Sequence, residues 1–287
     1  MRLIGVLLAL SLCCAAAADH TANVMRVGGY TKAMFEADRL DIEITTGLLF
    51  NELLREIDES ADIHVYDTYS EMLAGYKNGQ LDAAFCILIE CEELMAHSSD
   101  HDFFTTITNG SPYDRYVLLT RNDPRDESAN TLASLRGKRL SVIGSHSTGM
   151  LLLDRALQAS NLPDSASFFA DVVAPASSQA AIIDLFFGKT DAALVTRNEL
   201  SNAAALNPQV NSQLQTVFET GDVLSLVLMV HKDFPEDRAK LLGDMVDKVF
   251  SDPKQFPKSD QLVQLFGADS VVRIDPAAVA ATMRLTR

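Results

Sequence analysis

One phrase occurs twice in this sequence and constrains the fold more than any other feature. Residues 79–90 read GQLDAAFCILIE and residues 188–199 read GKTDAALVTRNE, so Gly-x-x-Asp-Ala-Ala precedes an apolar run twice, 109 residues apart. Upstream of each copy the sequence predicts a short strand, a Ser/Thr or Asp cap and a helix that stops at the glycine. The repeat therefore indicates two halves built on one plan.

Each half alternates short apolar runs with helical stripes. The strands expected are 24–27, 63–66, 81–89, 138–143, 170–174 and 192–196. The helices expected are 40–57, from Asp67 or Thr68 to Gly79, 150–159, and from Ser177 or Ser178 to Gly188. Two β-α-β-α-β units predict two parallel sheets with helices on both faces. Gly28-Gly29-Tyr30 is expected to turn out of the first strand.

Two more apolar runs, Tyr113–Thr120 and Val223–His231, are expected to cross between the lobes as hinge strands. A helix from Pro235 to about Phe250 follows the second run. The predicted fold class is therefore α/β and two-lobed, with a cleft between lobes that close about the hinge. The predicted divisions are a leader at 1–18, lobe 1 at 19–118, lobe 2 at 119–218, and a return to lobe 1 with C-terminal helices at 219–287.

The N-terminus is typical of a secretory signal peptide. Arg2 is followed by an apolar core from Leu3 to Leu12, and small residues precede a cleavage site near Ala18. Lipidation is disfavoured because Leu12, a large residue, stands before Cys13. No later run is long enough to span a bilayer. We therefore expect a mature protein that is exported to the periplasm and does not insert into the membrane.

The charge and the motifs exclude several classes of function. A net charge of −15 is unfavourable for binding nucleic acid. The chain has no Gly-x-Ser-x-Gly elbow, no His-Glu-x-x-His and no glycine-rich nucleotide loop, so we expect neither an enzyme nor a cofactor. His97 and His101 flank Asp100 with helical spacing, but that segment reads as a loop, and no metal site is predicted.

In open α/β sheets, ligands bind where strands end and helices begin. Polar residues stand at these points in both halves, and they form the candidate ligand site. They are Tyr30, Thr31, Asp67, Thr68, Tyr69, Cys86, Ser145, His146, Ser147, Thr148, Ser178, Gln179 and Arg197.

The stretch GSHSTG at 144–149 is the most informative of these. It places four hydroxyl or imidazole side chains between a strand and a helix start, where backbone N–H groups and the helix dipole favour an anion. Capping of the helix by the same side chains is the alternative. Arg197 can neutralise an anion or form a salt bridge at the surface or the hinge.

Cys86 and Cys91 are the two cysteines left after cleavage at residue 18. In an oxidising compartment they are expected to form a disulfide. On a continuous strand, however, they would point to opposite faces, so a bridge needs a turn between them. A buried free thiol and a thiol that contacts the ligand are the alternatives.

Residues 134–157 and 177–195 resemble the periplasmic phosphate-, phosphite- and phosphonate-binding proteins of ABC importers, and YDTYSEMLAGYKNGQLDAAF and LVLMVHKDFPEDRAKLL resemble their flanking segments. The resemblance covers about residues 22–270 and implies the type II periplasmic binding protein fold. It also implies capture of a small phosphorus oxyanion for an ABC permease.

The resemblance assigns the oxyanion to Ser147 and Thr148, with Ser145 nearby, and an aromatic wall to Tyr30. Two positions depart from the family pattern: Gln179 stands where a histidine is common, and His146 where Ser or Thr is common. The carboxylates that would hold a ligand ammonium are not placed, although Asp67 is one candidate.

A second relative is the group of arsenite-binding sensors that share this fold and work beside a histidine kinase. It gives the alternative that Cys86 binds a thiophilic oxyanion. The partner would then be a sensor kinase.

Overall fold

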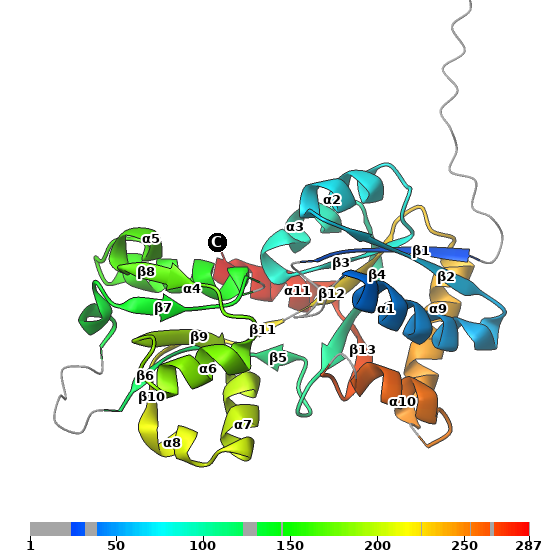
Figure 1. Cartoon of the computed structure of the whole chain (residues 1–287). Helices are drawn as coiled ribbons and strands as arrows, with labels where there is room; N and C mark the ends of the chain where they lie inside the picture. The colour runs from blue at the N-terminus through cyan, green and yellow to red at the C-terminus, as the bar shows by residue number, and fades with distance from the viewer. Residues whose placement is uncertain are drawn as a thin grey trace, which may run out of the picture.

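The computed structural model describes residues 24–31, 39–122, 131–144, 146–224, 226–252, 254–264 and 267–286. Two sheets form the two lobes, and a short ribbon joins them (Figure 1). The first sheet has the strand order β13 (Ser270–Ile274), β4 (Ser98–Ile107), β12 (Val227–His231), β3 (Ala83–Cys86), β1 (Val24–Tyr30) and β2 (Ser60–Tyr66). The second has the order β10 (Leu214–Glu219), β6 (Tyr116–Arg121), β9 (Ala192–Thr196), β7 (Arg139–Ser141) and β8 (Asp171–Val173).

Helices cover both faces of each sheet. Those of the first lobe are α1 (Arg39–Leu54), η1 (Arg55–Ile57), α2 (Tyr69–Lys77), η2 (Leu88–Glu90), α3 (Cys91–Met95), α9 (Glu236–Ser251), α10 (Pro257–Gln264), α11 (Pro276–Met283) and η5 (Arg284–Thr286). Those of the second are η4 (Leu132–Leu135), α4 (Ser147–Ala159), α5 (Ser165–Phe168), α6 (Ser178–Phe186), α7 (Arg197–Leu206) and α8 (Gln209–Gln213).

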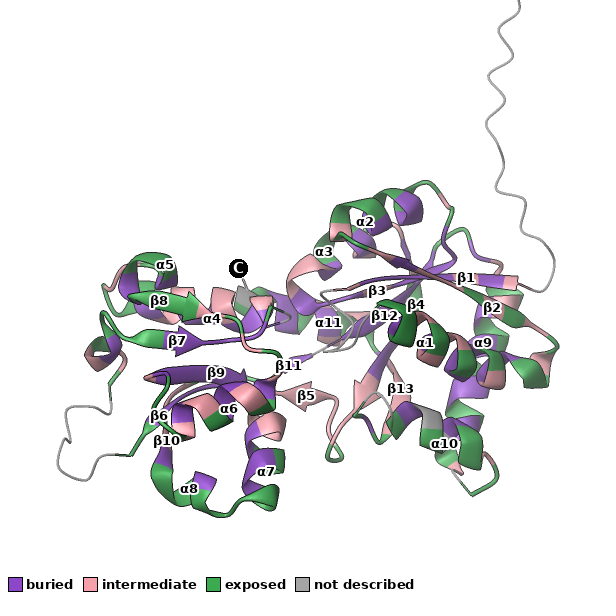
Figure 2. Cartoon of the chain, viewed as in Figure 1, coloured by how far each residue is buried: buried purple, intermediate pink, exposed green. Residues whose placement is uncertain are grey.

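Alternation along the strands explains why both faces are apolar. In β4, Phe103 packs with α2, α3 and α11, whereas its neighbour Phe104 packs with α1 and α9 on the opposite face. In β6, Leu118 faces the α4 side and Leu119 the α6 and α7 side. Side chains of successive strand residues point to opposite faces, so these central strands are apolar throughout. Figure 2 shows them buried between half-exposed helices.

The repeated Gly-x-x-Asp-Ala-Ala has the same structural role in both lobes. Gly79 and Gly188 both adopt positive φ, at 68° and 75°, which a residue with a side chain rarely tolerates. Asp82 accepts the backbone N–H of Arg26 in β1, at 2.7 Å, and Asp191 accepts that of Arg139 in β7, at 2.9 Å. The alanines that follow are fully buried. The phrase therefore ends a helix and fastens the next strand to the first strand of its lobe.

The lobes meet through two short segments. β5 (Tyr113–Asp114) and β11 (Val223–Leu224) pair antiparallel between the sheets. The predicted crossings were longer, but the remainder of each run, β6 or β12, belongs to a sheet. The C-terminal α11 packs against η2 and α3, and η5 contacts α4 of the second lobe. In Figure 1 this red segment lies between the lobes.

The prediction of two parallel sheets is confirmed for the β-α-β-α-β units and wrong for the other strands. β1 pairs parallel with β2 and β3, and β7 with β8 and β9, but β12 runs antiparallel to β3, and β6 antiparallel to β9. β6 follows the hinge segment β5, and β12 follows the hinge segment β11, so both enter their sheet from the cleft end and run opposite to the strands of the β-α-β units. Each sheet is mixed for this reason.

Two element boundaries also differ from prediction. β1 continues through Gly28, Gly29 and Tyr30 instead of turning there, and Tyr30 pairs with Tyr66 of β2. Gly28 is needed in the strand because a Cβ there would stand 3.3 Å from Met72 and even closer to Leu81. The expected strand 81–89 is only Ala83–Cys86, and the chain then turns into η2 and α3.

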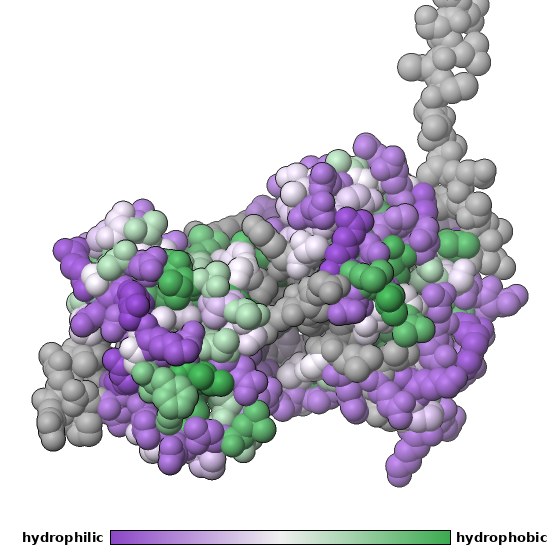
Figure 3. Space-filling view, viewed as in Figure 1, coloured by the Kyte–Doolittle hydropathy of each residue, from purple (hydrophilic) through white to green (hydrophobic). Residues whose placement is uncertain are grey.

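The apolar stripe predicted on α1 is not wholly buried. Leu49 and Leu53 lie in the core, but Ile44 and Leu48 are 52% and 54% exposed, beside exposed Leu40. Figure 3 shows apolar side chains on the surface over this helix. The stripe therefore combines a core face with a solvent face.

Candidate functional site

Three helices of the second lobe begin where three parallel strands end. α4 follows β7, α6 follows β8 after a short connection, and α7 follows β9 directly. Parallel strands end at the same edge of a sheet, so the three helix N-termini meet there. Each supplies backbone N–H groups without helical partners and the positive end of its dipole. This edge is favourable for negative charge.

Side chains from the three helix starts bond to one another. Nε2 of His146, the N-cap of α4, lies 3.2 Å from Oε1 of Glu199 in α7. The hydroxyl of Ser178 in α6 donates to the same oxygen at 2.5 Å, and the backbone N–H of Thr196 donates to Oε2 at 2.6 Å. These residues form the junction of the three helices, and Glu199 is its central acceptor.

The environment keeps Glu199 charged. Burial alone would raise the pKa of this carboxyl, but the hydrogen bond and the charge of His146, followed by the bonds from Ser178 and Thr196, lower the pKa below its ordinary value. The junction is thus a place where a carboxylate is stable.

Tyr116 of β6 packs against the junction. Its ring lies edge-on to that of His146, with centroids 5.2 Å apart. The Tyr116 ring also packs on Gly149 of α4, so closely that a Cβ at position 149 would stand 2.5 Å from the ring. Burial raises the pKa of the Tyr116 phenol, which is only 7% exposed. The start of α4 is therefore packed closely against β6.

Among the described residues, His146, the N-cap of α4, makes no side-chain hydrogen bond to the backbone N–H groups of the first turn. His146 directs its ring into the junction, and the hydroxyl of Ser147 donates to the carbonyl of Gly144 at 3.2 Å. The first α-helical bond runs from the N–H of Met150 to the carbonyl of His146. Thr148 is buried beside it. Ser145, which sequence analysis places here, lies outside the described residues.

The first lobe contributes two tyrosines and a glutamate. The hydroxyl of Tyr30 donates to the carboxyl of Glu90, and that of Tyr69 donates to the Glu90 carbonyl at 2.7 Å. The two rings meet edge-on, with centroids 5.6 Å apart. Burial raises the pKa of Glu90 to about 7. Because η2, which contains Glu90, packs against α4, this group adjoins the second lobe.

Cys86 and Cys91 form a disulfide, with their Cα atoms 5.6 Å apart. The turn through η2 makes this geometry possible, since β3 ends at Cys86 and α3 begins at Cys91. A disulfide sulfur is no thiolate ligand, so the interpretation of Cys86 as the ligand of a thiophilic oxyanion is wrong for this state of the protein.

The other candidate residues have partners in the local structure. Thr68 caps α2 in a capping box with Glu71, and the Thr31 hydroxyl donates to the Asp67 carbonyl at 3.4 Å. The Asp67 side chain is 75% exposed and pairs with Arg39 at 3.3 Å. None of these side chains is in contact with the junction in the bonds described.

Two candidates in the second lobe are also peripheral. Gln179 is exposed on α6. Arg197 forms an ion pair with Glu219, next to the pair of Arg115 and Asp222 at 2.6 Å. These charged side chains lie around the hinge. Arg197 therefore forms a salt bridge, which was one of the two roles expected for it from the sequence.

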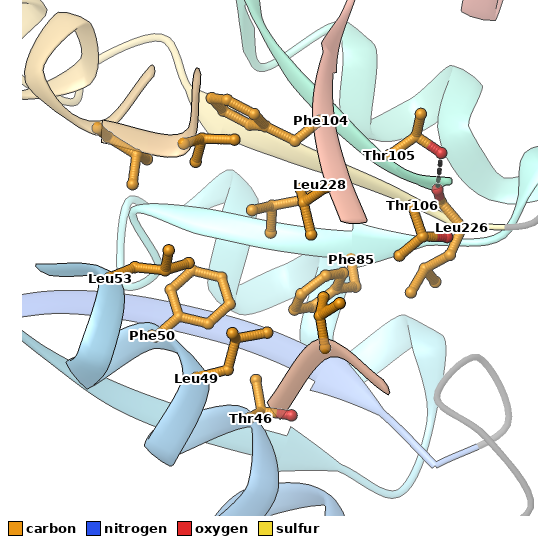
Figure 4. A pocket seen from close by; sticks show the side chains of 14 residues that line it. Thr46, Leu49, Phe50, Leu53, Phe85, Phe104, Thr105, Thr106, Leu226 and Leu228 are labelled. Carbon is orange, nitrogen blue, oxygen red and sulfur yellow. Dashed lines mark hydrogen bonds between the residues drawn. The ribbon is translucent and has the colours of Figure 1, made fainter. Parts of the chain in front are cut away.

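The apolar pocket of the first lobe is a different kind of space. Its volume is about 60 Å³, and it lies between the sheet and α1, α9 and α10, with Phe50, Phe85 and Phe104 in its wall (Figure 4). Its polar side chains are Thr46, Thr105 and Thr106, and none of the described residues that line it is charged. A cavity of this composition does not suit an oxyanion.

Sequence reasoning missed Glu90, Tyr116 and Glu199. Glu199 is visible in the sequence only as the third helical residue after Thr196, a capping-box position that the structure confirms. Its contact with His146 spans 53 positions and leaves no local signal. Glu90 was missed because residues 81–89 read as one strand.

Two α/β lobes, two hinge segments and an anion-favourable edge between them define a two-lobed substrate-binding protein of the type II periplasmic fold. The family can also be stated. A family model described as "ABC transporter, phosphonate, periplasmic substrate-binding protein" matches residues 38–278, and the chain belongs to this family.

Solved structures agree on the fold. A Prochlorococcus marinus protein in complex with methylphosphonate has a TM-score of 0.66 at 15% identity, over 92% of this chain and 97% of the other. A component of a Pseudomonas aeruginosa phosphonate transporter gives 0.65 at 14%, over 92% and 85%. A Xanthomonas citri protein bound to chloride gives 0.67 at 16%, over 92% and 96%. No curated protein matches the chain.

Within the described residues, no helix combines the length and apolar character needed to cross a membrane. The same residues contain no cluster of three or more His, Cys, Asp or Glu side chains that could hold a metal ion. The family's role is substrate binding for transport, and the alternative of a partner for a sensor kinase has no support.

Proposed function

We propose that this protein captures a small phosphonate, or a related phosphorus oxyanion, at the N-terminus of α4 and delivers it to an ABC permease. The observation that carries the proposal is the start of α4 in a member of this family, where the side chain of the N-cap His146 turns to Glu199 and makes no cap hydrogen bond among the described residues. Its N–H groups, with the hydroxyls of Ser147 and Thr148, are the donors that a tetrahedral oxyanion requires. Ser145 belongs to the same proposal.

The first lobe closes the site in this proposal. Tyr30 and Tyr69 supply an aromatic wall, and η2 brings them toward α4. Rotation about β5 and β11 would shut the lobes around the ligand and create the joined surface that a permease reads. Thr31, Asp67, Thr68, Gln179 and Arg197 are assigned no direct contact.

Export is part of the proposal. Residues 1–18 act as a signal peptide, and the mature chain begins near Asp19 and works in the periplasm, where the disulfide forms. N-terminal sequencing of the periplasmic protein tests this directly. A chain that retains residues 1–18 in that fraction contradicts it.

A thermal-shift screen tests the ligand class. At a ligand concentration of about a hundred times Kd, binding stabilises the folded state by about 2.7 kcal/mol. Methylphosphonate, phosphite, phosphate and sulfate are the probes. If all of them leave the melting temperature unchanged, the ligand class is wrong. Thr148→Ala should weaken the response, and an undiminished response would remove the start of α4 from the site.

A further inference from the structure

Both ring nitrogens of His146 face acceptors. Nε2 meets the carboxylate of Glu199 at 3.2 Å, and Nδ1 meets the carbonyl oxygen of Leu194 at 3.4 Å. Neither acceptor carries a proton, so the imidazolium is the form in which both ring nitrogens donate and both contacts are hydrogen bonds. The ring is 6% exposed. In that form His146 and Glu199 are an ion pair whose charges cancel, with the histidine buried and the glutamate partly exposed.

The pair occupies the junction on which the α4 site rests. Besides His146, the Glu199 carboxylate accepts hydrogen bonds from Ser178 and from the N–H of Thr196, and its side chain remains 28% exposed. Among the described residues, the carboxylate of Asp114 on the hinge strand β5 also interacts electrostatically with Glu199, and it accepts the N–H groups of Arg115 and Asn198. Glu90, on the first lobe, accepts the Tyr30 hydroxyl.

The charge of the junction follows from this pairing. With His146 in place, Glu199 adds no net charge behind the first turn of α4, so an oxyanion meets the N–H groups without repulsion. If the histidine is lost, the partly exposed carboxylate of Glu199 remains beside the N-cap position of α4 without its cationic partner. It would repel an anion and attract an ammonium group.

We infer that the His146–Glu199 pair sets the charge selectivity of the site, which accepts phosphonates without an amine in preference to phosphonates that carry an ammonium group. The inference rests on the proposed function and narrows its ligand class. His146 is a positioning residue: it acts through Glu199 and has no ring nitrogen left for the ligand.

The competing interpretation is that His146 only packs against Tyr116. Packing predicts that every ligand weakens in parallel when the histidine is replaced. Charge selectivity predicts that the ratio of two affinities changes, and that removing the Glu199 charge rescues the histidine variant. The two interpretations therefore differ in the affinity ratio and in the rescue by the second substitution, and a general loss of stability changes neither of them.

The experiment measures Kd by calorimetry for methylphosphonate and 2-aminoethylphosphonate. The proteins are the wild type, His146→Asn, Glu199→Gln and the double variant. His231→Asn is the matched control, because His231 is also a buried histidine packed edge-on against a tyrosine, Tyr76, but lies in the first lobe. Melting temperatures are recorded for all five proteins.

The wild type is expected to prefer methylphosphonate. His146→Asn should shift the affinity ratio toward the amine by about tenfold or more, and the double variant should bind methylphosphonate about tenfold more tightly than His146→Asn alone. His231→Asn should leave the ratio unchanged.

A wild type that binds both ligands equally, or a double variant no better than the single, overturns the inference but leaves the proposed function standing. A wild type that binds neither ligand nor any oxyanion of the screen overturns the proposed function itself.

Discussion

Glu90 is the residue whose protonation depends most clearly on the fold. Burial raises the pKa of its carboxyl from 4.5 to about 7. Between pH 4.5 and pH 7 the carboxyl is therefore protonated in the folded protein and ionised in the unfolded chain. The stability that protonation contributes is complete below pH 4.5 and is lost as pH rises to about 7. Its upper bound is about 3.5 kcal/mol, at about 1.4 kcal/mol per pKa unit, and solvent screening of this partly exposed side chain lowers the actual contribution.

Glu90→Gln should therefore remove a fall in stability between pH 5 and pH 8. The amide can still accept the hydrogen bond from Tyr30, and it has no charge to desolvate. Urea denaturation at four pH values in this range measures the effect. An unchanged pH slope in the variant would show that Glu90 titrates normally in the folded protein.

Gly149 is the second residue whose identity the structure explains. A Cβ there would approach the Tyr116 ring at 2.5 to 2.9 Å, and both the helix and the strand that hold the two residues are fixed. Alanine normally stabilises a helix interior by about 1 kcal/mol relative to glycine. The overpacking, of about 1–3 kcal/mol, should outweigh this gain and displace the start of α4.

Gly149→Ala should thus lower both stability and oxyanion affinity. Gly144→Ala is the control for stability, since a Cβ at that position meets nothing within 4 Å. Chemical denaturation and calorimetry with methylphosphonate measure the two effects. Equal stability of the two variants would contradict the close packing of Tyr116 on α4.

At the scale of elements, the disulfide links the end of β3 to the start of α3. It closes a loop of about six residues, for which the loop-entropy relation gives about 2 kcal/mol of stabilisation. The double variant Cys86→Ser, Cys91→Ser should lose this amount and still bind the oxyanion, because no sulfur contacts the α4 site. Loss of methylphosphonate binding in a variant that remains folded would place the cysteines in the site.

Most elements could be predicted because their signals are local. The caps at Thr68 and Ser177 and the positive-φ glycines 79 and 188 mark helix ends in the sequence itself. The end of β3 could not be predicted, because residues 81–89 form one apolar run whether the chain extends or turns. Sheet direction failed for a similar reason, since it depends on where the hinge segments enter.

The candidate site was predictable only in part. Ser147, Thr148 and Ser178 follow strands in the sequence, so their position at one edge follows from topology. The contacts that set the charge there do not: Tyr30 meets Glu90 across 60 positions and His146 meets Glu199 across 53. Pairs at such separations are brought together by packing, not by local pattern.

At the scale of the whole molecule, each lobe has a core cluster of its own, and two short hinge strands connect the lobes. One buried cluster lies entirely in the first lobe and another entirely in the second, so each should move as a rigid body. The hinge consists of two paired strands of two residues each, β5 and β11. The ion pairs of Arg115 and Arg197 lie beside it. A larger apolar cluster contains residues of both lobes.

Ligand binding should therefore change the angle between the lobes and leave each lobe unchanged. We expect the radius of gyration, measured by small-angle X-ray scattering, to fall when methylphosphonate is added in excess. Thr148→Ala at the same ligand concentration should show a smaller decrease, because fewer donors hold the oxyanion. A wild-type protein that binds methylphosphonate with no change in scattering would mean that the lobes are already closed without ligand, and that capture does not work by rotation about β5 and β11.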